Sequence, residues 1–445
     1  MKKIFFTILL QLFLSAIAQE LDLGFWKKFD DEILISNIVQ SYNNNLDLKI
    51  ANSKIKESEK IVKLSLSQEL PTLSFDGLMG RTFASSNLER GKNNFAINNY
   101  KLTRFLLPLS VSWEVDIWGK NRLKTKSTKQ SLKMIEQDKK ATLVLLETSI
   151  AANYYNLIKI DKLIELEQDL YNLNSSLLTL VEKKEKTGLA SPLDVLSVKE
   201  VLIESRQKID NLEAKREVLE NQTGYLLGDK LLSKIERKDF SKVKLIENFP
   251  FELNSNIIFN RPDVISAKEN ILRADYNAKA AKREFLPAFT VSGTLGFNGY
   301  NTLSKLFASN TGLAELWVIP QFDIIDGNRK YNFLKLKKLE LDRSYLEYDR
   351  AVLASIEEVN DSLVLLKNEN KNYELSKDNL DIANKKAKLN LSNKQYGLAS
   401  EIDYILYQTK QIIAQQKYVS DKINYIISMV SLYKTVGGIN FIDSL

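Results

Sequence analysis

The sequence predicts a mostly α-helical protein with a membrane β-barrel part, built from two copies of a helix-strand-strand-long helix-helix unit. Two long segments, residues 120–187 and 328–396, contain neither glycine nor proline and are rich in Leu, Lys, Glu and Ser. Shorter segments before each of them alternate apolar and polar residues. The tetrapeptide Gly-Leu-Ala-Ser follows each long segment, at 188–191 and at 397–400. These three observations predict two helical hairpins, each preceded by a pair of strands.

Residues 1–18 predict a secretory signal peptide. Lys2 and Lys3 precede a mostly apolar run over residues 4–14, and Ala-Ile-Ala follows at 16–18. The run is short for a membrane-spanning helix, and it ends in small residues as a cleavage site does. We therefore expect export of the chain with cleavage after Ala18. The sequence has no cysteine, which excludes disulfides and a lipid attached to cysteine.

The first copy of the unit is predicted over residues 19–226. It holds a helix at about 43–70, strands at about 71–83 and 102–118, the long helix 120–187 and a returning helix 193–223. The second of these strands is the more regular, because Leu109, Val111 and Trp113 alternate with polar residues. The glycine at 188 suits the left-handed conformation in which many helices end.

The second copy is predicted over residues 261–436, after an equatorial linker region at 227–260 and before a C-terminal tail at 437–445. It holds strands at about 288–300 and 313–324, the long helix 328–396 and a returning helix 401–436. Asn-Leu-Asp at 45–47 aligns with Arg-Pro-Asp at 261–263, and Leu-Pro at 70–71 aligns with Leu-Pro at 286–287. The repeat therefore extends well beyond the two tetrapeptides.

The predicted strands are long enough to cross a membrane. A strand of about ten residues spans a bilayer when it is tilted, and no later segment reaches about 18 consecutive apolar residues. Four strands cannot close on themselves, and an open edge in lipid leaves backbone groups unpaired at several kcal/mol each. We therefore expect a homotrimer with a barrel of about twelve strands, since the smallest membrane barrels have about eight.

Composition argues against most enzymes. The chain has no histidine and no cysteine, which removes histidine-based triads, thiolate nucleophiles and the commonest zinc ligands. Its net charge is +7, but basic and acidic residues are interleaved, which is typical of solvated helix faces and not of a nucleic-acid interface. We predict no enzyme activity, no catalytic, metal-binding or cofactor-binding residue, and no nucleic-acid partner. An exported hydrolase that uses carboxylates is the alternative in the enzyme class.

Four motifs follow one another along the chain. WEVDIWG at 113–119 joins the second strand to the long helix, and GLASPLDVL at 188–196 forms the first tip. Arg-Pro-Asp-Val at 261–264 leads through spaced alanines to Phe-Leu-Pro at 285–287, and Val-Gly-Gly stands at 436–438. In this order they resemble the TolC-like outer-membrane efflux protein family, also called the outer membrane factors. The resemblance covers essentially the whole chain after the signal peptide.

The resemblance implies a homotrimeric channel-tunnel of a Gram-negative bacterium, with a β-barrel in outer-membrane lipid and an α-helical barrel in the periplasm. It implies two further partners, a periplasmic adaptor (membrane fusion) protein and an inner-membrane pump of the resistance-nodulation-division or ABC type. The implied function is a passive exit duct for drugs or small toxic compounds. The alternatives are the outer-membrane channel of a type I protein secretion system and, outside the family, a periplasmic coiled-coil scaffold or adaptor.

Both hairpin tips are candidate contacts with the adaptor. The residues concerned are Gly188, Leu189, Ala190 and Ser191 in the first tip and Gly397, Leu398, Ala399 and Ser400 in the second. The alternative is that each glycine only turns the chain. Members of the family often hold the closed state through an arginine two positions after the tip glycine. Ala399 occupies that position here, so we expect different gating contacts.

Carboxylates beside the tips are candidates for the pore and for helix capping. Asp403, with Glu401 nearby, is predicted at the pore constriction, where a ring of three carboxylates would favour cations. The alternative is that Asp403 caps the returning helix, where a carboxylate suits the helix dipole. Asp194, its counterpart in the first half, and Asp263 are predicted to cap helices.

Overall fold

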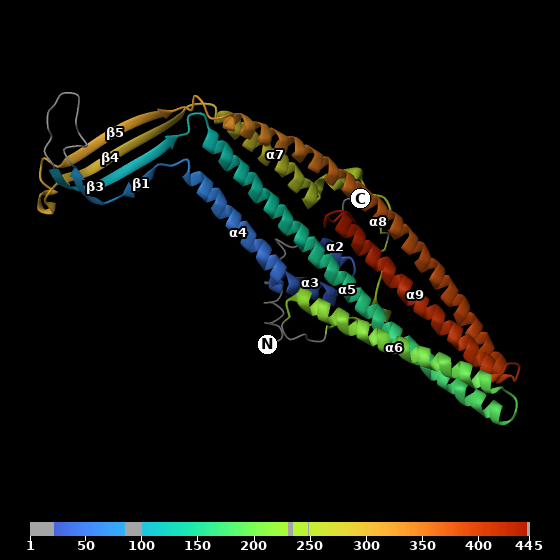
Figure 1. Cartoon of the computed structure of the whole chain (residues 1–445). Coiled ribbons are helices and arrows are strands. Elements are labelled where there is room, and N and C mark those ends of the chain that lie inside the picture. The colour runs from blue at the N-terminus through green and yellow to red at the C-terminus, as the bar shows by residue number, and fades with distance from the viewer. Residues whose placement is uncertain (1–21, 85–99, 230–234, 248, 443–445) are drawn as a thin grey trace, which may run out of the picture. The chain divides into compact units, whose positions relative to one another are not determined.

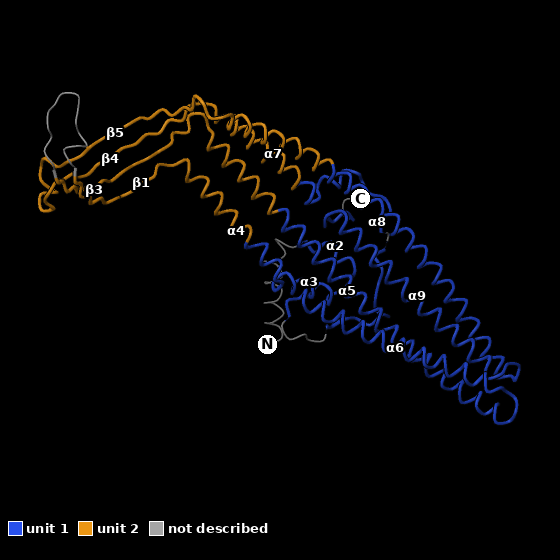
Figure 2. The backbone as a smooth tube through the Cα atoms, viewed as in Figure 1, with its two compact units in different colours: residues 1–53, 137–265, 350–445 blue, residues 54–136, 266–349 orange. Residues whose placement is uncertain are grey.

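The computed structural model describes residues 22–84, 100–229, 235–247 and 249–442 (Figure 1). The chain divides into two compact units (Figure 2). Unit 1 comprises residues 1–53, 137–265 and 350–445, and unit 2 comprises residues 54–136 and 266–349. The predicted signal peptide 1–18, most of the predicted loop between the first two strands and the end of the predicted tail lie outside the described residues.

Helices make up most of the described chain, so the prediction of a mostly helical protein is confirmed. The two long helices, α5 (Lys120–Lys186) and α8 (Arg329–Gln395), each have residues in both units. The returning helices are α6 (Pro192–Leu227) and α9 (Glu401–Thr435). The shorter helices are α2 (Gly24–Lys27), α3 (Glu32–Asn44), α4 (Leu46–Ser67) and α7 (Pro262–Arg283), with short 3-10 turns at Phe240–Lys242, Ser255–Asn260 and Leu303–Lys305.

Two of these helices, α2 and α3, are absent from the prediction. Asp31 starts α3, because its carboxylate accepts the backbone N–H groups of Ile33 (3.1 Å) and Leu34 (3.2 Å). Asn45 ends α3, and its side chain accepts the N–H of Asp47 (2.8 Å) at the start of α4. The helix expected at about 43–70 therefore begins only after this break, and another helix precedes it.

Unit 2 contains a five-stranded antiparallel sheet in the order β1-β3-β4-β5, with β2 also paired to β3. The strands are β1 (Thr72–Phe75), β2 (Leu78–Ala84), β3 (Tyr100–Val115), β4 (Ala288–Tyr300) and β5 (Gly312–Gln321). The single strand expected at about 71–83 is thus two strands, β1 and β2. Asp76 lies between them and donates its N–H to the carbonyl of Pro108 (3.3 Å), but proline has no N–H to return. The ladder is interrupted there.

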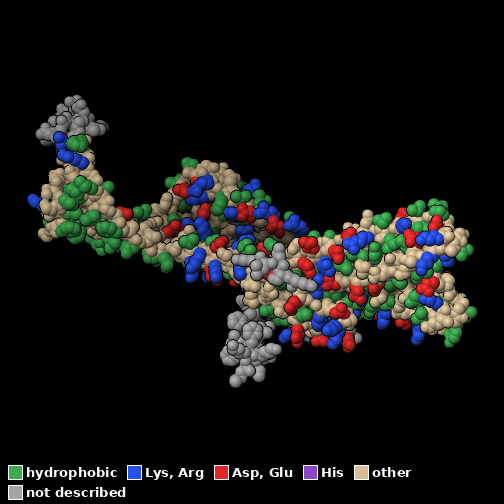
Figure 3. Space-filling view, turned by 90° about the horizontal axis from the view of Figure 1, so that it is seen from below, with side chains coloured by type: hydrophobic (Ala, Val, Ile, Leu, Met, Phe, Trp, Pro, Cys, Tyr) green, Lys and Arg blue, Asp and Glu red, His purple; other side chains and the backbone are tan. Residues whose placement is uncertain are grey.

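One face of this sheet is apolar and the other is largely polar. Leu109 lies opposite Phe75 on β1 and Leu295 on β4, whereas the next residue, Ser110, lies opposite Ser74 and Thr294. Cross-strand partners share a face, and successive residues alternate between faces. The apolar face is also exposed: the side chains of Phe75 and Leu295 are 66% and 61% accessible. Hydrophobic side chains gather over the strands in Figure 3.

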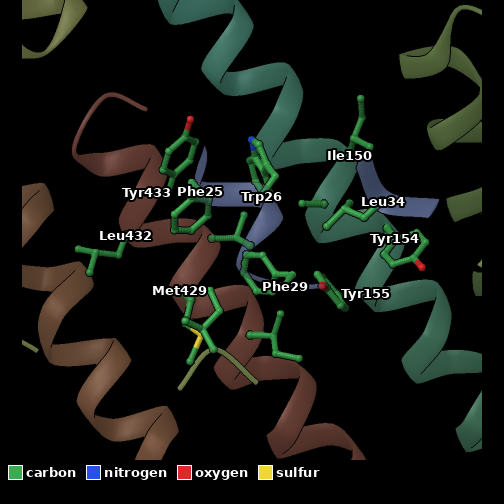
Figure 4. Packing of buried hydrophobic residues seen from close by; sticks show 14 of the residues in the cluster. Phe25, Trp26, Phe29, Leu34, Ile150, Tyr154, Tyr155, Met429, Leu432 and Tyr433 are labelled. Atoms are coloured by element: carbon green, nitrogen blue, oxygen red, sulfur yellow. The ribbon is translucent and has the colours of Figure 1, made fainter. Parts of the chain in front are cut away.

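Aromatic residues from three helices form the centre of the core of unit 1 (Figure 4). Phe25 and Trp26 of α2 are fully buried, and the Phe25 ring stacks on Tyr433 of α9 with ring centroids 4.1 Å apart. Tyr154 and Tyr155 complete the cluster from α5. Truncating one such buried ring to alanine costs about 3–5 kcal/mol. The short helix α2 is therefore firmly anchored between α5 and α9.

Candidate functional site

Both long helices end in the same glycine-dependent turn. Gly188 has φ of 73° and Gly397 has φ of 75°, in the left-handed region that residues with a side chain rarely adopt. The N–H of Leu189 bonds to the carbonyl of Lys184, and the N–H of Leu398 bonds to that of Asn393, at 2.8 Å each. A Cβ added at either glycine would meet no atom within 4 Å. The backbone angle, and not crowding, therefore requires glycine at both tips.

Both returning helices begin with the same capping box. In α6, Ser191 N–H donates to Asp194 Oδ2 (2.8 Å) and Asp194 N–H donates to Ser191 Oγ (3.3 Å). In α9, Ser400 N–H donates to Asp403 Oδ2 (3.0 Å) and Asp403 N–H donates to Ser400 Oγ (3.1 Å). Each pair satisfies backbone donors that the first turn of a helix leaves free. Asp194 and Asp403 thus occupy the same structural position.

Asp403 carries one hydrogen bond more than its counterpart. The hydroxyl of Ser400 also donates to Oδ2 of Asp403, at 2.7 Å. These hydrogen bonds hold the pKa of Asp403 below its ordinary value, and the positive charge of Lys184 adds to the effect. The carboxylate is exposed. It is therefore a stable negative charge at the surface of the second tip, and it caps the helix there.

Glu401 is engaged in an ion pair that was not predicted from the sequence. Lys394, in the last turn of α8, places its Nζ 2.5 Å from Glu401 Oε2. The same ammonium lies over the ring of Tyr404, 4.1 Å from its centre. Lys394 therefore links the two ends of the turn. The sequence contains a local sign of this ion pair, because Lys394 near the end of one helix is followed by the acidic residues Glu401 and Asp403 at the start of the next.

The tips expose apolar side chains. Leu189 and Leu398, at equivalent positions, are 76% and 77% accessible, whereas Ala190 and Ala399 beside them are half-buried. Large apolar groups that project into solvent together mark candidate contact surfaces. Each tetrapeptide therefore presents a protruding leucine on a rigid turn between small residues, and in the first tip Leu193, which is 72% accessible, follows it.

Asp263, which was predicted to cap a helix, is bound by the side chain of Arg261. The Arg261 side chain is buried and donates to both carboxylate oxygens of Asp263 (3.0 and 2.7 Å). It also donates to Glu358 Oε2 (2.7 Å) and to the carbonyl of Thr435 (2.6 Å). The guanidinium thus ties the start of α7 to α8 and to the end of α9. Asp263 also accepts the N–H of Val264 (2.9 Å), in the first turn of α7.

Within the described ranges, no cluster of three or more His, Cys, Asp or Glu side chains could hold a metal ion. None of the described helices combines the length and the apolar character that crossing a bilayer takes. The features that stand out are therefore the two tips, the exposed apolar face of the sheet and the arginine-centred tie between α7, α8 and α9.

The fold thus combines a sheet that has an exposed apolar face with two capped helical hairpins. The family model described as "Outer membrane efflux protein" matches residues 37–228 and 253–438. The chain belongs to this family of outer membrane efflux proteins, which form channels and are not enzymes. The predicted family is thereby confirmed.

Individual relatives cover nearly the whole chain. The solvent efflux pump outer membrane protein SrpC of Pseudomonas putida is 23% identical over 415 residues, which cover 92% of this chain and 86% of the relative. The cation efflux system protein CusC of Escherichia coli K12 is 24% identical over 426 residues, or 93% and 88% of the two chains. The crystal structure of the Campylobacter jejuni CmeC outer membrane channel has a TM-score of 0.84 at 21% identity, covering 93% and 87%. Crystal structures of CusC give a TM-score of 0.80 at 20% identity, covering 93% and 94%.

Proposed function

We propose that this protein is the outer-membrane exit duct of a tripartite efflux system and works as a homotrimer. The observation that carries the proposal is the sheet of unit 2. Its apolar face is exposed, and within the described residues its outer strands β1 and β5 each pair on one side only. Such a face is stable in lipid, but its open edges are not, because no water is present to bind the free backbone groups. Strands from further copies would satisfy them.

Three copies would close the sheet. Because β1 and β2 both pair with β3 in one continuous register, each copy contributes four strand positions. Three copies then give a barrel of about twelve strands, within the range of membrane barrels. On α8, Leu339, Leu346 and Leu353 recur at heptad spacing and are 58%, 70% and 67% accessible. Apolar residues in that spacing pack against another helix, which supports assembly of an α-helical barrel.

In this proposal the chain is exported by the signal peptide 1–18 and consists of two structural repeats, 19–226 and 261–436, joined by the equatorial linker 227–260 and followed by the tail 437–445. The paired helix ends at Gly188 and Gly397, and the paired capping boxes that follow them, support the duplication. The two tips would contact a periplasmic adaptor protein, which links the duct to an inner-membrane pump of the resistance-nodulation-division or ABC type. The exposed Leu189 and Leu398 support a contact there.

The constriction of the duct is proposed at Asp403 and Glu401. Capping and pore lining are compatible, because Ser400 binds Oδ2 of Asp403 while the carboxylate as a whole stays exposed. Threefold symmetry would bring three such charges together and favour cations.

Small toxic molecules, including drugs, are the proposed cargo. The relatives are named for pumps of solvents, toluene, antibiotics and cations, which favours small molecules over the secretion of proteins. The test is expression of the full chain in a Gram-negative host, followed by membrane fractionation and purification in detergent. We expect a trimer in the outer membrane that conducts ions in planar bilayers. A monomer that is soluble without detergent would contradict the proposal.

A further inference from the structure

The link between β4 and β5, residues 301–311, folds back over the apolar face of the sheet. Gly299 lies on that face, and a Cβ added to it would come within 3.0 Å of Leu306 Cδ1 and 3.2 Å of Leu306 Cα. Leu306 is buried there, and the ring of the next residue, Phe307, packs edge-on against Phe297 with ring centroids 5.0 Å apart. The link therefore builds a wall on a face that the strands alone would leave flat.

An open apolar groove lies beside this wall. Strands β1, β3 and β4 contribute large apolar side chains to its lining, whereas β5 contributes small residues: Phe75, Leu107, Leu109, Leu295, Gly312 and Ala314. On the same face of β5, the larger Leu316 and Val318 follow towards the helices. The groove therefore lies in the half of the sheet farther from the helices, where small residues between large ones leave room for an apolar chain.

Two positive charges lie on the same face, nearer the end of the strands. Arg81 lies opposite Thr103, and Lys101 lies opposite Phe83, at positions of β3 that alternate onto the face of Leu107. The guanidinium of Arg81 and the ammonium of Lys101 lie 5.3 and 5.6 Å from the centre of the Phe83 ring. Neither cation takes part in an ion pair among the described residues. Basic side chains also adjoin the hydrophobic surface at this end of the strands in Figure 3.

The cations and the groove are spaced along β3 like the parts of a lipid molecule. Leu107, in the groove, is four residues from Thr103, the partner of Arg81, and six residues from Lys101. At about 3.3 Å per residue, these separations are about 13 and 20 Å along the strand. A charge on the lipid-facing side of a membrane strand is costly at the bilayer midplane and tolerated near the interface. The two cations therefore belong at the level of lipid headgroups, with the groove at the level of acyl chains.

We propose that this face of the sheet binds a phosphorylated lipid, with a phosphate between Arg81 and Lys101 and an acyl chain in the groove beside Phe307. Charge-assisted hydrogen bonds from the guanidinium and the ammonium would hold the phosphate, and burial of the chain would add a hydrophobic contribution. The inference rests on the proposed function, in which the apolar face meets lipid and the helices lie in the periplasm. The end of the strands away from the helices then lies in the outer leaflet, so the ligand is a lipid of that leaflet.

The probe is lipid A that carries two phosphates, compared with the same lipid after removal of both phosphates. Native mass spectrometry of the full chain, purified as a trimer in detergent and titrated with each lipid, counts the bound molecules and gives their dissociation constants. We expect one lipid A for each copy of the chain, bound at least tenfold more tightly than the dephosphorylated lipid. Equal binding of the two lipids would overturn the proposal. Inorganic phosphate in hundredfold excess should not displace lipid A, because it has no acyl chain, and displacement would assign the site to free phosphate and overturn the lipid site.

The variant Arg81→Gln/Lys101→Gln should weaken binding of lipid A at least tenfold, because it removes both positive charges from the site. The matched control is Arg104→Gln/Lys371→Gln, which removes as many exposed positive charges. Arg104 lies at the same end of the sheet but on its other face, opposite Tyr300, and Lys371 lies on α8. Binding should stay within twofold in the control. Losses of equal size in both double variants would indicate a general attraction to a basic protein and would overturn the proposal.

The groove is tested separately by Ala314→Phe, which fills it and keeps the face apolar. Binding of lipid A should weaken at least fivefold in this variant. Val318→Phe adds a phenyl ring to the same face of β5 outside the groove, and it should leave binding within twofold of the wild type. Unchanged binding in Ala314→Phe would overturn the proposed place of the acyl chain.

Conductance in planar bilayers is recorded for the same preparations. Trimers that conduct ions but bind both lipids equally refute only the lipid site, whereas a wild-type protein that forms neither trimers nor channels refutes the proposed function. Normal conductance of Arg81→Gln/Lys101→Gln, together with weakened lipid binding, supports a lipid site that is separate from the pore.

Discussion

Trp26 donates its indole N–H to Glu147 Oε2 over 3.1 Å, inside the core of unit 1. The hydroxyl of Tyr433 donates to the same oxygen over 3.4 Å. All three side chains are buried, and they come from α2, α5 and α9. A single carboxyl group therefore joins the N-terminal helix to two helices of the core.

This arrangement predicts a stability that falls as the pH rises. Burial raises the pKa of Glu147 to about 7, although the hydrogen bonds from Trp26 and Tyr433 favour the ionised form. An unfolded glutamate titrates near pH 4.3, so the folded state binds the proton more tightly. The stabilisation is complete below about pH 4.3 and is lost as the pH rises through about 7. It amounts to about 4 kcal/mol.

The variant Glu147→Gln tests this prediction. Glutamine keeps an acceptor for Trp26 but carries no charge, so the variant should keep its Tm between pH 5 and pH 8 while the wild type loses several degrees. Thermal unfolding of the full chain in detergent measures both. Glu182→Gln, at a half-exposed glutamate, is the control and should follow the wild type. A pH response that is the same in Glu147→Gln and the wild type would refute the role of Glu147.

The contacts of Arg261 predict that its substitution destabilises the protein. Its buried guanidinium binds Asp263, Glu358 and the carbonyl of Thr435. Arg261→Ala should cost about 1.5–3 kcal/mol, because it removes charge-assisted hydrogen bonds to Asp263 and Glu358, whose own side chains are about half exposed. Arg261→Lys should also destabilise, since an ammonium group cannot reproduce the planar fork. Thermal or denaturant unfolding measures both.

The control for Arg261 is Arg343→Ala. Arg343 pairs with Glu347 at 3.4 Å, but its side chain is 68% accessible. Exposed pairs of this kind contribute about 0–1 kcal/mol. A loss of similar size in Arg261→Ala would mean that the network adds little to the fold.

The parts of this fold that the sequence predicts are the regular ones. Long helices and alternating strands repeat a local pattern many times, so α5, α8 and β3 are visible without tertiary information. The core that anchors α2 cannot be predicted in this way, because Trp26 and Glu147 are 121 positions apart and no local pattern pairs them. A glutamate within a charged helix is typical of a solvated face. The bonds from Arg261 to Glu358 and to the carbonyl of Thr435 could not be predicted for the same reason, because both partners lie far along the chain.

Replacing a tip glycine should destabilise the protein through the backbone conformation alone. Gly397→Ala should destabilise by roughly 1–2 kcal/mol, because an L-residue is strained at positive φ. Gly397→Asn should cost less, since asparagine tolerates the left-handed region. Gly80→Ala is the control: that site also has no atom within 4 Å of an added Cβ, but its φ is not positive. Unfolding experiments should therefore show a larger loss of stability for Gly397→Ala than for Gly397→Asn. Equal losses at 80 and 397 would contradict the argument.

Bulky residues at the tips should block export without breaking the assembly. Ala190→Trp and Ala399→Trp place a large ring beside the exposed leucines, where we propose the adaptor contact. Antibiotic susceptibility of a host that depends on this channel should rise to the level of a deletion, while the purified variants remain trimers. Lys215→Trp, on the exposed surface of α6 away from the tip, should leave efflux unchanged. Normal efflux in both tip variants would leave the glycine turn as the only role of the tetrapeptides.

Asp403 allows pore lining and helix capping to be separated in one experiment. Asp403 is the N3 residue of the capping box, and Ser400 is the N-cap. Asparagine at 403 keeps a side-chain oxygen that can accept the Ser400 N–H, so Asp403→Asn should preserve most of the stability of α9 while it removes the charge. If three copies of Asp403 line the constriction, reversal potentials in planar bilayers should show weaker cation selectivity in the variant. Asp194→Asn makes the same change in the matching capping box of the first tip and should leave selectivity unchanged. Cation preference that survives in Asp403→Asn would leave this residue with its capping role alone.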